Sequence, residues 1–97
     1  MRVYHFSEQS YYPAWNEHSG TLRVTFPNRK CDPHVAAELF HRYYDELQFA
    51  DELGLDIMLN EHHQTATCMS SSVAIGLAVL ARITKRARLL VLGYPIA

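Results

Sequence analysis

Hydrophobic residues recur along the chain with two different periods, one typical of strands and one typical of helices. The segment from Val3 to Phe6 is rich in β-branched and aromatic residues, which predicts a first strand that ends near Ser7. Further along, apolar residues recur at alternating steps of four and three, the spacing of one helix face. The residues on that predicted face are Ala36, Phe40, Tyr43, Leu47 and Ala50.

The residues at both ends of this predicted helix are types that favour helix starts and helix ends. Asp32 can accept backbone N–H groups of the first turn, and Pro33 lacks an N–H where none is needed. Gly54 predicts the helix end. The apolar run Leu55–Leu59 follows at once and predicts a second strand, because helix-to-strand connections commonly span about 2–6 residues.

The same pattern then occurs a second time. Ser70–Ser72 offer N-caps for a second helix, which has few charges before Arg82 and is therefore expected to be largely buried. The apolar run Leu89–Leu92, closed by Gly93 and Pro95, predicts a third strand. The periodic positions of the second helix are Val73, Leu77, Leu80 and Thr84.

The predicted order is strand, helix, strand, helix, strand, which is typical of a parallel α/β fold with right-handed crossovers. The second and third strands begin about thirty residues apart, the unit length of a (β/α)₈ barrel of about 250 residues. A three-stranded sheet alone would leave both edges exposed. We therefore expect residues 1–97 to be a single partial domain, the first three strands and two helices of a TIM-type barrel. A complete small three-layer domain is the alternative.

A long connection separates the first strand from the first helix. Residues 8–31 have no sustained helical period, and loops of this length in compact domains are typically lids or binding loops. Thr21–Phe26 is a candidate for a brief strand within it. Tyr11, Tyr12 and Trp15 either pack the rim of the fold or form a wall over a flat apolar ligand.

Composition narrows the range of partners. The net charge is -1, with 9 Lys and Arg against 10 Asp and Glu, so no general attraction to nucleic acid or anionic lipid is expected. Lys85, Arg86 and Arg88 lie where the second helix should end, a favourable place for cations. Cys31 and Cys68 have no disulfide-like spacing, and no apolar run is long enough to span a membrane. These features predict a cytoplasmic protein that is not bound to a membrane.

Polar residues gather where the second strand ends. The stretch Leu55–His63 passes without a turn residue from apolar strand into Asn60, Glu61, His62 and His63. Ligands bind at the carboxyl ends of strands in parallel α/β folds. Because side chains alternate along a strand, Asn60 and His62 are expected to face the barrel mouth, and the more apolar face is expected to meet the helices.

Several kinds of chemistry fit such a strand end. A histidine there can be a structural residue, a general acid or base, a metal ligand or a group that orients a cofactor. A metal is the weakest of these, because catalytic metal sites usually need about three converging ligands and no His-x-x-x-His or His-x-His pair is present. Cys68 is expected to be a small buried residue. The sequence contains no glycine-rich phosphate loop and no nucleophile elbow.

Three motifs and their order are informative in combination. They are Leu-Asp-Ile-Met-Leu-Asn-Glu-His-His, then Ala-Arg-Ile-Thr-Lys-Arg-Ala-Arg-Leu, then a strand that closes on Gly-Tyr-Pro-Ile. From Asp32 to Ala97 the chain resembles the N-terminal part of the bacterial luciferase-like flavin-dependent monooxygenases. That resemblance implies a (β/α)₈ barrel with reduced FMN at its carboxyl-end mouth.

The resemblance also implies roles for particular residues. His62 would lie beside the flavin and take part in proton transfer, with Glu61 as its orienting neighbour and Asn60 near the cofactor. A non-prolyl cis peptide beneath the flavin ring would join Gly93 to Tyr94. Cis links of this kind cost about 3–4 kcal/mol and persist at functional sites.

The implied activity is the oxygenation of a small apolar organic substrate by dioxygen. FMN would be reduced by NAD(P)H, directly or through a separate flavin reductase. Separately from the resemblance, the alternative in which the aromatic residues form a wall over a ligand predicts that Tyr12 and Trp15 contact the substrate. The alternatives are a deazaflavin-dependent oxidoreductase on the same barrel and a truncated fragment without activity. The resemblance further implies that the full-length protein is a homodimer, and that the flavin phosphate is bound by loops beyond the third strand.

Overall fold

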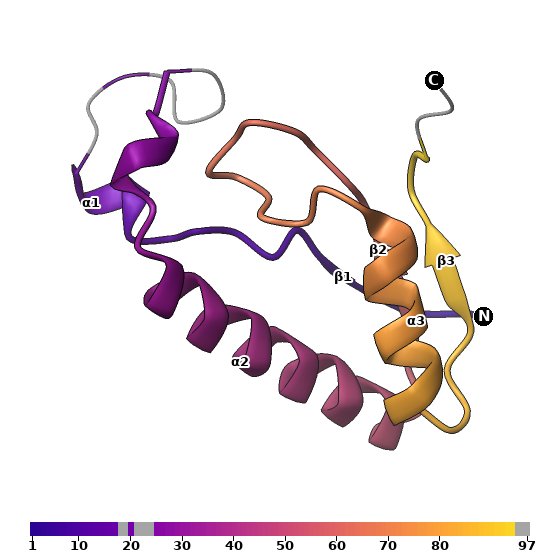
Figure 1. Cartoon of the computed structure of the whole chain (residues 1–97). Helices are drawn as coiled ribbons and strands as arrows, with labels where there is room; N and C mark the ends of the chain where they lie inside the picture. Colours follow the sequence, from indigo (N-terminus) through magenta and orange to yellow (C-terminus); the bar gives the residue numbers. More distant parts are fainter. Residues whose placement is uncertain (18–19, 21–24, 95–97) are drawn as a thin grey trace.

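The computed structural model describes residues 1–17, 20 and 25–94 and consists of a three-stranded parallel sheet with helices (Figure 1). The strands lie in the order β1–β2–β3, and two long helices, α2 and α3, make the connections between them. This confirms the predicted order of strands and helices and the parallel sheet. The bounds are β1 Tyr4–Ser7, α2 Pro33–Glu52, β2 Asp56–Leu59, α3 Val73–Ile83 and β3 Leu89–Val91.

Both long helices cover the same face of the sheet (Figure 1). Ile57 and Leu59 of β2 are fully buried and form one core cluster with Leu47 of α2 and with Val73 and Leu80 of α3. Because successive strand residues point to opposite faces, this cluster requires the odd-numbered residues of β2 to meet the helices. The expectation that the more apolar face of this strand meets the helices is confirmed.

The opposite face of the sheet carries a row of apolar side chains. Phe6, Met58 and Leu90 are neighbours in the register of the three strands. Phe6 is 42% exposed and Leu90 is 40% exposed, and no helix among the described residues covers this row. Parallel sheets are normally covered on both faces, so this row is the unpartnered side of the sheet.

The beginning and end of α2 follow the predicted signals. One carboxylate oxygen of Asp32 accepts hydrogen bonds from the backbone nitrogens of His34 at 2.8 Å and Val35 at 3.4 Å. Gly54 adopts φ +80°, the left-handed conformation in which glycine terminates helices without steric cost. Local residue chemistry is therefore sufficient to place this helix.

The connection between β1 and α2 contains structure that the sequence pattern did not reveal. It holds a four-residue helix α1 (Ala14–Glu17) and a 3₁₀ turn η1 (Asn28–Lys30). Of the candidate strand Thr21–Phe26, residues 21–24 lie outside the described residues, and the last two form a turn and a bend. The connection also contributes to a second core cluster, which joins it to α2 and to the loop after β2. That cluster is Tyr11, Ala14, Phe26, Leu39 and Ala66.

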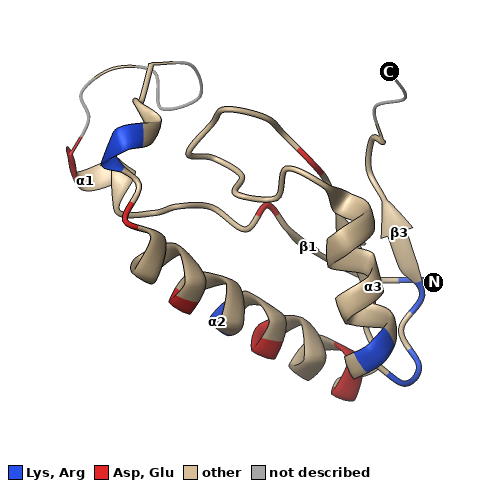
Figure 2. Cartoon of the chain, in the orientation of Figure 1, with Lys and Arg blue, Asp and Glu red and all other residues tan. Residues whose placement is uncertain are grey.

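The turn between α3 and β3 is tied to the end of α2 by a buried carboxylate. Asp51 accepts hydrogen bonds from the backbone nitrogens of Lys85 at 2.8 Å, Arg86 at 2.9 Å and Ala87 at 2.6 Å. These bonds, that from Lys85 first, lower the pKa of Asp51. The Arg86 guanidinium donates to the carbonyl oxygens of Asp51 and Glu52. The basic turn, which follows the end of α3, therefore also contacts the acidic end of α2 (Figure 2).

Candidate functional site

The polar residues after β2 lie in a loop that folds back on itself before α3 begins. Residues 60–72 leave the sheet at its carboxyl end and return, and the backbone nitrogen of His62 donates to the carbonyl oxygen of Ser70 at 3.1 Å. The backbone nitrogen of Met69 donates to the carbonyl oxygen of Gln9, which follows β1. These bonds hold the loop against the ends of the first two strands.

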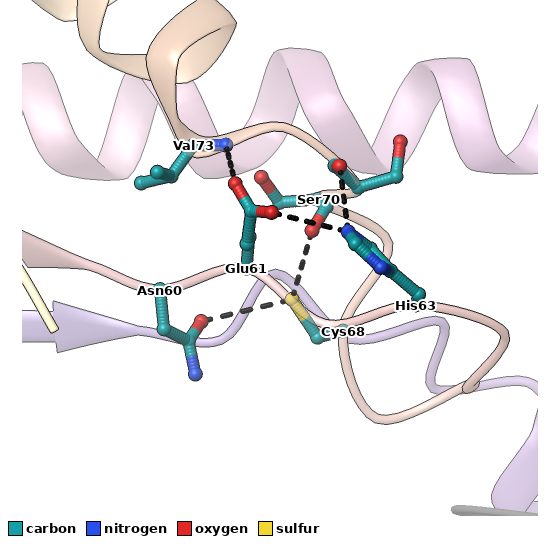
Figure 3. Close-up of polar contacts among 7 residues, drawn as sticks. Asn60, Glu61, His63, Cys68, Ser70 and Val73 are labelled. Atoms are coloured by element: carbon teal, nitrogen blue, oxygen red, sulfur yellow. Dashed lines mark hydrogen bonds and ion pairs between the residues drawn. The ribbon is translucent and has the colours of Figure 1, made fainter. Parts of the chain in front are cut away.

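Glu61 acts as the cap of α3 (Figure 3). One of its carboxylate oxygens accepts a hydrogen bond from the backbone nitrogen of Val73 at 2.9 Å, and its side chain is only 7% exposed. Ser72 occupies the N-cap position but makes no side-chain cap bond. The expectation that a serine side chain caps this helix is therefore wrong. The Glu61 carboxylate accepts the Val73 N–H in place of a serine hydroxyl.

His63 completes the same cluster. Its Nε2 lies 3.1 Å from the other Glu61 oxygen and 3.1 Å from the carbonyl oxygen of Ser71. Both neighbours are acceptors, so the tautomer with a proton on Nε2 fits this position. The Glu61 carboxylate thus contacts His63 and Val73, and no hydrogen bond joins it to the His62 ring among the described residues. Glu61 and His63 together hold the strand end in shape, and orientation of His62 by Glu61 stays a prediction.

Asn60 and Cys68 form a second, more deeply buried pair (Figure 3). The Cys68 thiol lies 3.6 Å from both the Asn60 side-chain oxygen and the Ser70 carbonyl oxygen. The Asn60 amide nitrogen donates to the Glu8 carboxylate at 3.4 Å. Burial raises the pKa of Cys68, so the thiol stays protonated and unreactive, and the expectation of a small buried cysteine is confirmed. Both ends of the Asn60 amide are engaged, and its contact with a cofactor stays a prediction.

His62 differs from these neighbours because its ring makes no hydrogen bond to any residue that the structure describes. The residue is half-buried and lines a cavity of about 300 Å³. The cavity lies between the loop after β2, the connection before α2 and the first turns of α2. An imidazole in this position can donate or accept a hydrogen bond. Its expected position at a barrel mouth stays a prediction.

The walls of this cavity are mostly apolar. They come from three parts of the chain that are distant in sequence, so the cavity exists only in the folded protein. The apolar wall residues are Tyr11, Phe26, Ala36, Phe40, Ala66 and Met69.

Of the three aromatic residues that the sequence pattern singled out, Tyr11 lines this cavity and Tyr12 and Trp15 do not. Tyr12 is 50% exposed and Trp15 is 48% exposed, and neither lines the cavity. Tyr11 lines it instead, buried to 6% exposure, with its hydroxyl oxygen accepting the backbone N–H of Asp32 at 3.0 Å. Two long-range hydrogen bonds hold Tyr11 in this position, one from its backbone nitrogen to Ala66 and one from the Asp32 nitrogen to its hydroxyl oxygen. Substrate contacts of Tyr12 and Trp15 stay predictions.

The segment after β3 differs from the expectation at one point. Gly93 has φ +83°, and no peptide bond between described residues is cis, so the expected cis link from Gly93 to Tyr94 is wrong for this structure. A cis non-prolyl bond persists only where surrounding packing compels it. Tyr94 is 57% exposed, so such packing is absent around it. Flavin contacts of Gly93 and Tyr94 stay predictions.

Three further findings bear on function. The described residues contain no group of three or more His, Cys, Asp and Glu side chains placed to hold a metal ion. Among the same residues, no helix combines the length and apolar character needed to cross a membrane. Comparison of the chain with protein-family models, with curated proteins and with solved structures finds no match. The family resemblance therefore rests on the sequence motifs.

Proposed function

We propose that this chain is the N-terminal part of a (β/α)₈ barrel enzyme similar to the luciferase-like monooxygenases. It would oxygenate a small apolar substrate with dioxygen and reduced FMN. The observation that carries the proposal is the position of His62. Its imidazole, unbonded among the described residues, lies at the carboxyl end of the middle strand and beside an apolar cavity.

The position of both helices on one face of the sheet favours a closed barrel rather than an open sheet. Doubly wound α/β sheets carry helices on both faces, whereas barrels carry all helices outside and fill the inside with apolar side chains. Here α2 and α3 share one face, and Phe6, Met58 and Leu90 form an apolar row on the other. The strand order β1–β2–β3 is also the order that a barrel requires.

The apolar walls of the cavity suit the small organic substrate, and the flavin ring would lie next to this cavity on the side of His62. No charged residue lines the cavity to hold the phosphate of FMN. The phosphate would therefore be held by residues outside this cavity. When bound, the reduced flavin supplies the electrons that activate dioxygen.

The protein's own residues would manage protons and water. His62 would hold or release a proton at a ring nitrogen, a role that typically contributes about 10²–10⁴-fold to rate. Glu61 and His63 keep the strand end and the start of α3 together, which fixes the backbone around His62. In the complete barrel, the apolar walls would help to exclude water from the reacting groups.

The test is turnover by the full-length product of the gene, measured as oxygenated substrate formed with FMN and with a deazaflavin in separate reactions. We expect His62→Ala to lower kcat by about 100-fold or more with FMN. His41→Ala is the matched control, because His41 is exposed on α2 and lies outside the cavity. Unchanged kcat in His62→Ala, or turnover with the deazaflavin alone, would contradict the proposal.

The barrel itself has a separate test. The reading frame beyond Ala97 is expected to encode five more β/α units. A frame that ends without them, or micromolar FMN binding by the 97 residues alone, would contradict the proposed incomplete barrel.

A further inference from the structure

The cavity beside His62 has no carboxylate, ammonium or guanidinium group on its walls. None of its lining residues is Asp, Glu, Lys or Arg. The Lys30 ammonium lies 6.0 Å from the Phe26 ring centroid, yet Lys30 is not one of the lining residues. Burying an ion without a partner costs far more than burying a neutral polar group. The walls therefore offer no carboxylate, ammonium or guanidinium group to pair with an ionised ligand, which favours an uncharged one.

Aromatic and sulfur-containing side chains dominate the apolar part of the wall. Tyr11 and Phe26 lie with their ring centroids 6.4 Å apart at an interplanar angle of 41°, and Phe40 and Met69 contribute further walls. Tilted aromatic pairs and thioethers make favourable contacts with a further aromatic ring. The volume of about 300 Å³ is at the lower end of the range for ligand cavities, enough for one ring or a fused pair.

The same wall offers polar groups that are not engaged within the described structure. The side chains of His62, Gln64 and Asn28 make no hydrogen bond to a described residue, and each can donate and accept. Asn28 and Gln64 are exposed and can bond solvent, whereas His62 is half-buried. The His62 ring therefore favours a ligand with a neutral polar substituent, because a purely apolar ligand that covered the ring would leave it unpaired.

We infer that this cavity binds a small, uncharged aromatic molecule with one neutral hydrogen-bonding group. The inference deepens the proposed function by naming a substrate class, and it rests on that function only where the ligand is called a substrate. Binding of this ligand requires no flavin. The ligand class and the monooxygenase function can therefore be tested, and contradicted, independently of each other.

Three probes of nearly identical shape test the effect of ligand charge on binding. Benzamide is neutral, benzoate is an anion and benzamidine is a cation. Binding is followed in flavin-free protein through the NMR signals of the Met69 methyl group and the His62 ring. We expect saturable shifts with benzamide and at least about tenfold weaker binding of both ions. Equal binding of all three probes, or no shift with benzamide up to its solubility limit, overturns the inference.

A pair of neighbouring substitutions locates the binding. Ala36 lines the cavity, whereas Ala37 is exposed on the same helix and does not. Ala36→Leu should fill the cavity and abolish the benzamide shifts, and Ala37→Leu should leave them unchanged. Benzamide binding that survives in a folded Ala36→Leu variant overturns the inference.

Chemical labelling supplies a measurement that does not depend on the folding of a variant. Cys31 is exposed and lines the cavity, whereas Cys68 is buried. Maleimide adds to the thiol of Cys31 without a leaving group. Benzamide should slow this addition severalfold and benzoate should not. Equal rates with the two probes would place the ligand elsewhere and overturn the inference.

Discussion

The Glu61 carboxylate lies 2.9 Å from the backbone nitrogen of Val73, so a residue at the end of β2 caps the helix that follows twelve positions later. This contact joins the strand end to the helix start across the whole loop of residues 60–72. The contacts that fix the backbone around His62 therefore also fix the start of α3.

Glu61→Ala should destabilise the protein by about 0.5–2 kcal/mol, the usual cost of losing a helix cap. The substitution leaves the Val73 N–H without its partner and removes the contact to His63. Urea denaturation followed by circular dichroism measures the change. Glu38→Ala, at an exposed position on α2, should have little effect. Equal stability of the two variants would show that the cap is unimportant.

Asp51 should make stability depend on pH in the acid range. Its backbone hydrogen bonds lower its pKa in the folded state, so its stabilising contribution is fully present above the unfolded pKa of about 4. That contribution is lost as the pH falls from about 4 through the lower folded pKa. Asp51→Asn should be less stable near neutral pH, with the difference from the native chain shrinking on acidification. Thermal unfolding at several pH values tests this, and a constant difference would contradict it.

The two cysteines should react very differently with iodoacetamide. Cys31 is exposed, whereas Cys68 is 2% exposed and burial raises its pKa. Because the thiolate is the nucleophile, Cys68 should react at least about 100-fold more slowly at pH 8 in the folded protein. Mass spectrometry of Cys31→Ser should then show an unlabelled protein until urea is added. Rapid labelling of this variant without urea would contradict the buried position of Cys68.

Gly76 should tolerate alanine but not a larger side chain. A Cβ there would lie 3.2 Å from Leu59 Cδ1 and 3.3 Å from the Tyr44 hydroxyl oxygen, which is tight but adjustable. For Gly76→Ala the gain in helix propensity, about 0.8–1 kcal/mol, offsets this crowding. Gly76→Leu should cost about 1–3 kcal/mol through overpacking. Urea unfolding of both variants and of Ala78→Leu, at an exposed position on α3, measures the effect. A fully stable Gly76→Leu would contradict the packing between α3 and β2.

Much of the fold was predictable because it depends on local patterns. The helical spacing around Leu47 and the cap at Asp32 act over a few residues, and both predicted the correct helix. The alternation in β2 predicted that Ile57 and Leu59 would meet the helices. The short elements α1 and η1 were not predicted, because they have too few residues for a helical spacing of apolar positions to be recognised.

The sequence by itself determined where strands and helices lie, which face of β2 is buried, and that His62 stands at the end of a strand. Only the tertiary structure decided that Glu61 caps α3, that Arg86 contacts the end of α2, and that Tyr11 lines the cavity while Tyr12 does not. The physical reason is the range of the interactions. Periods and caps arise from neighbours within a turn or a pleat, whereas these contacts join residues separated by a long stretch of chain and exist only after the helices have packed on the sheet.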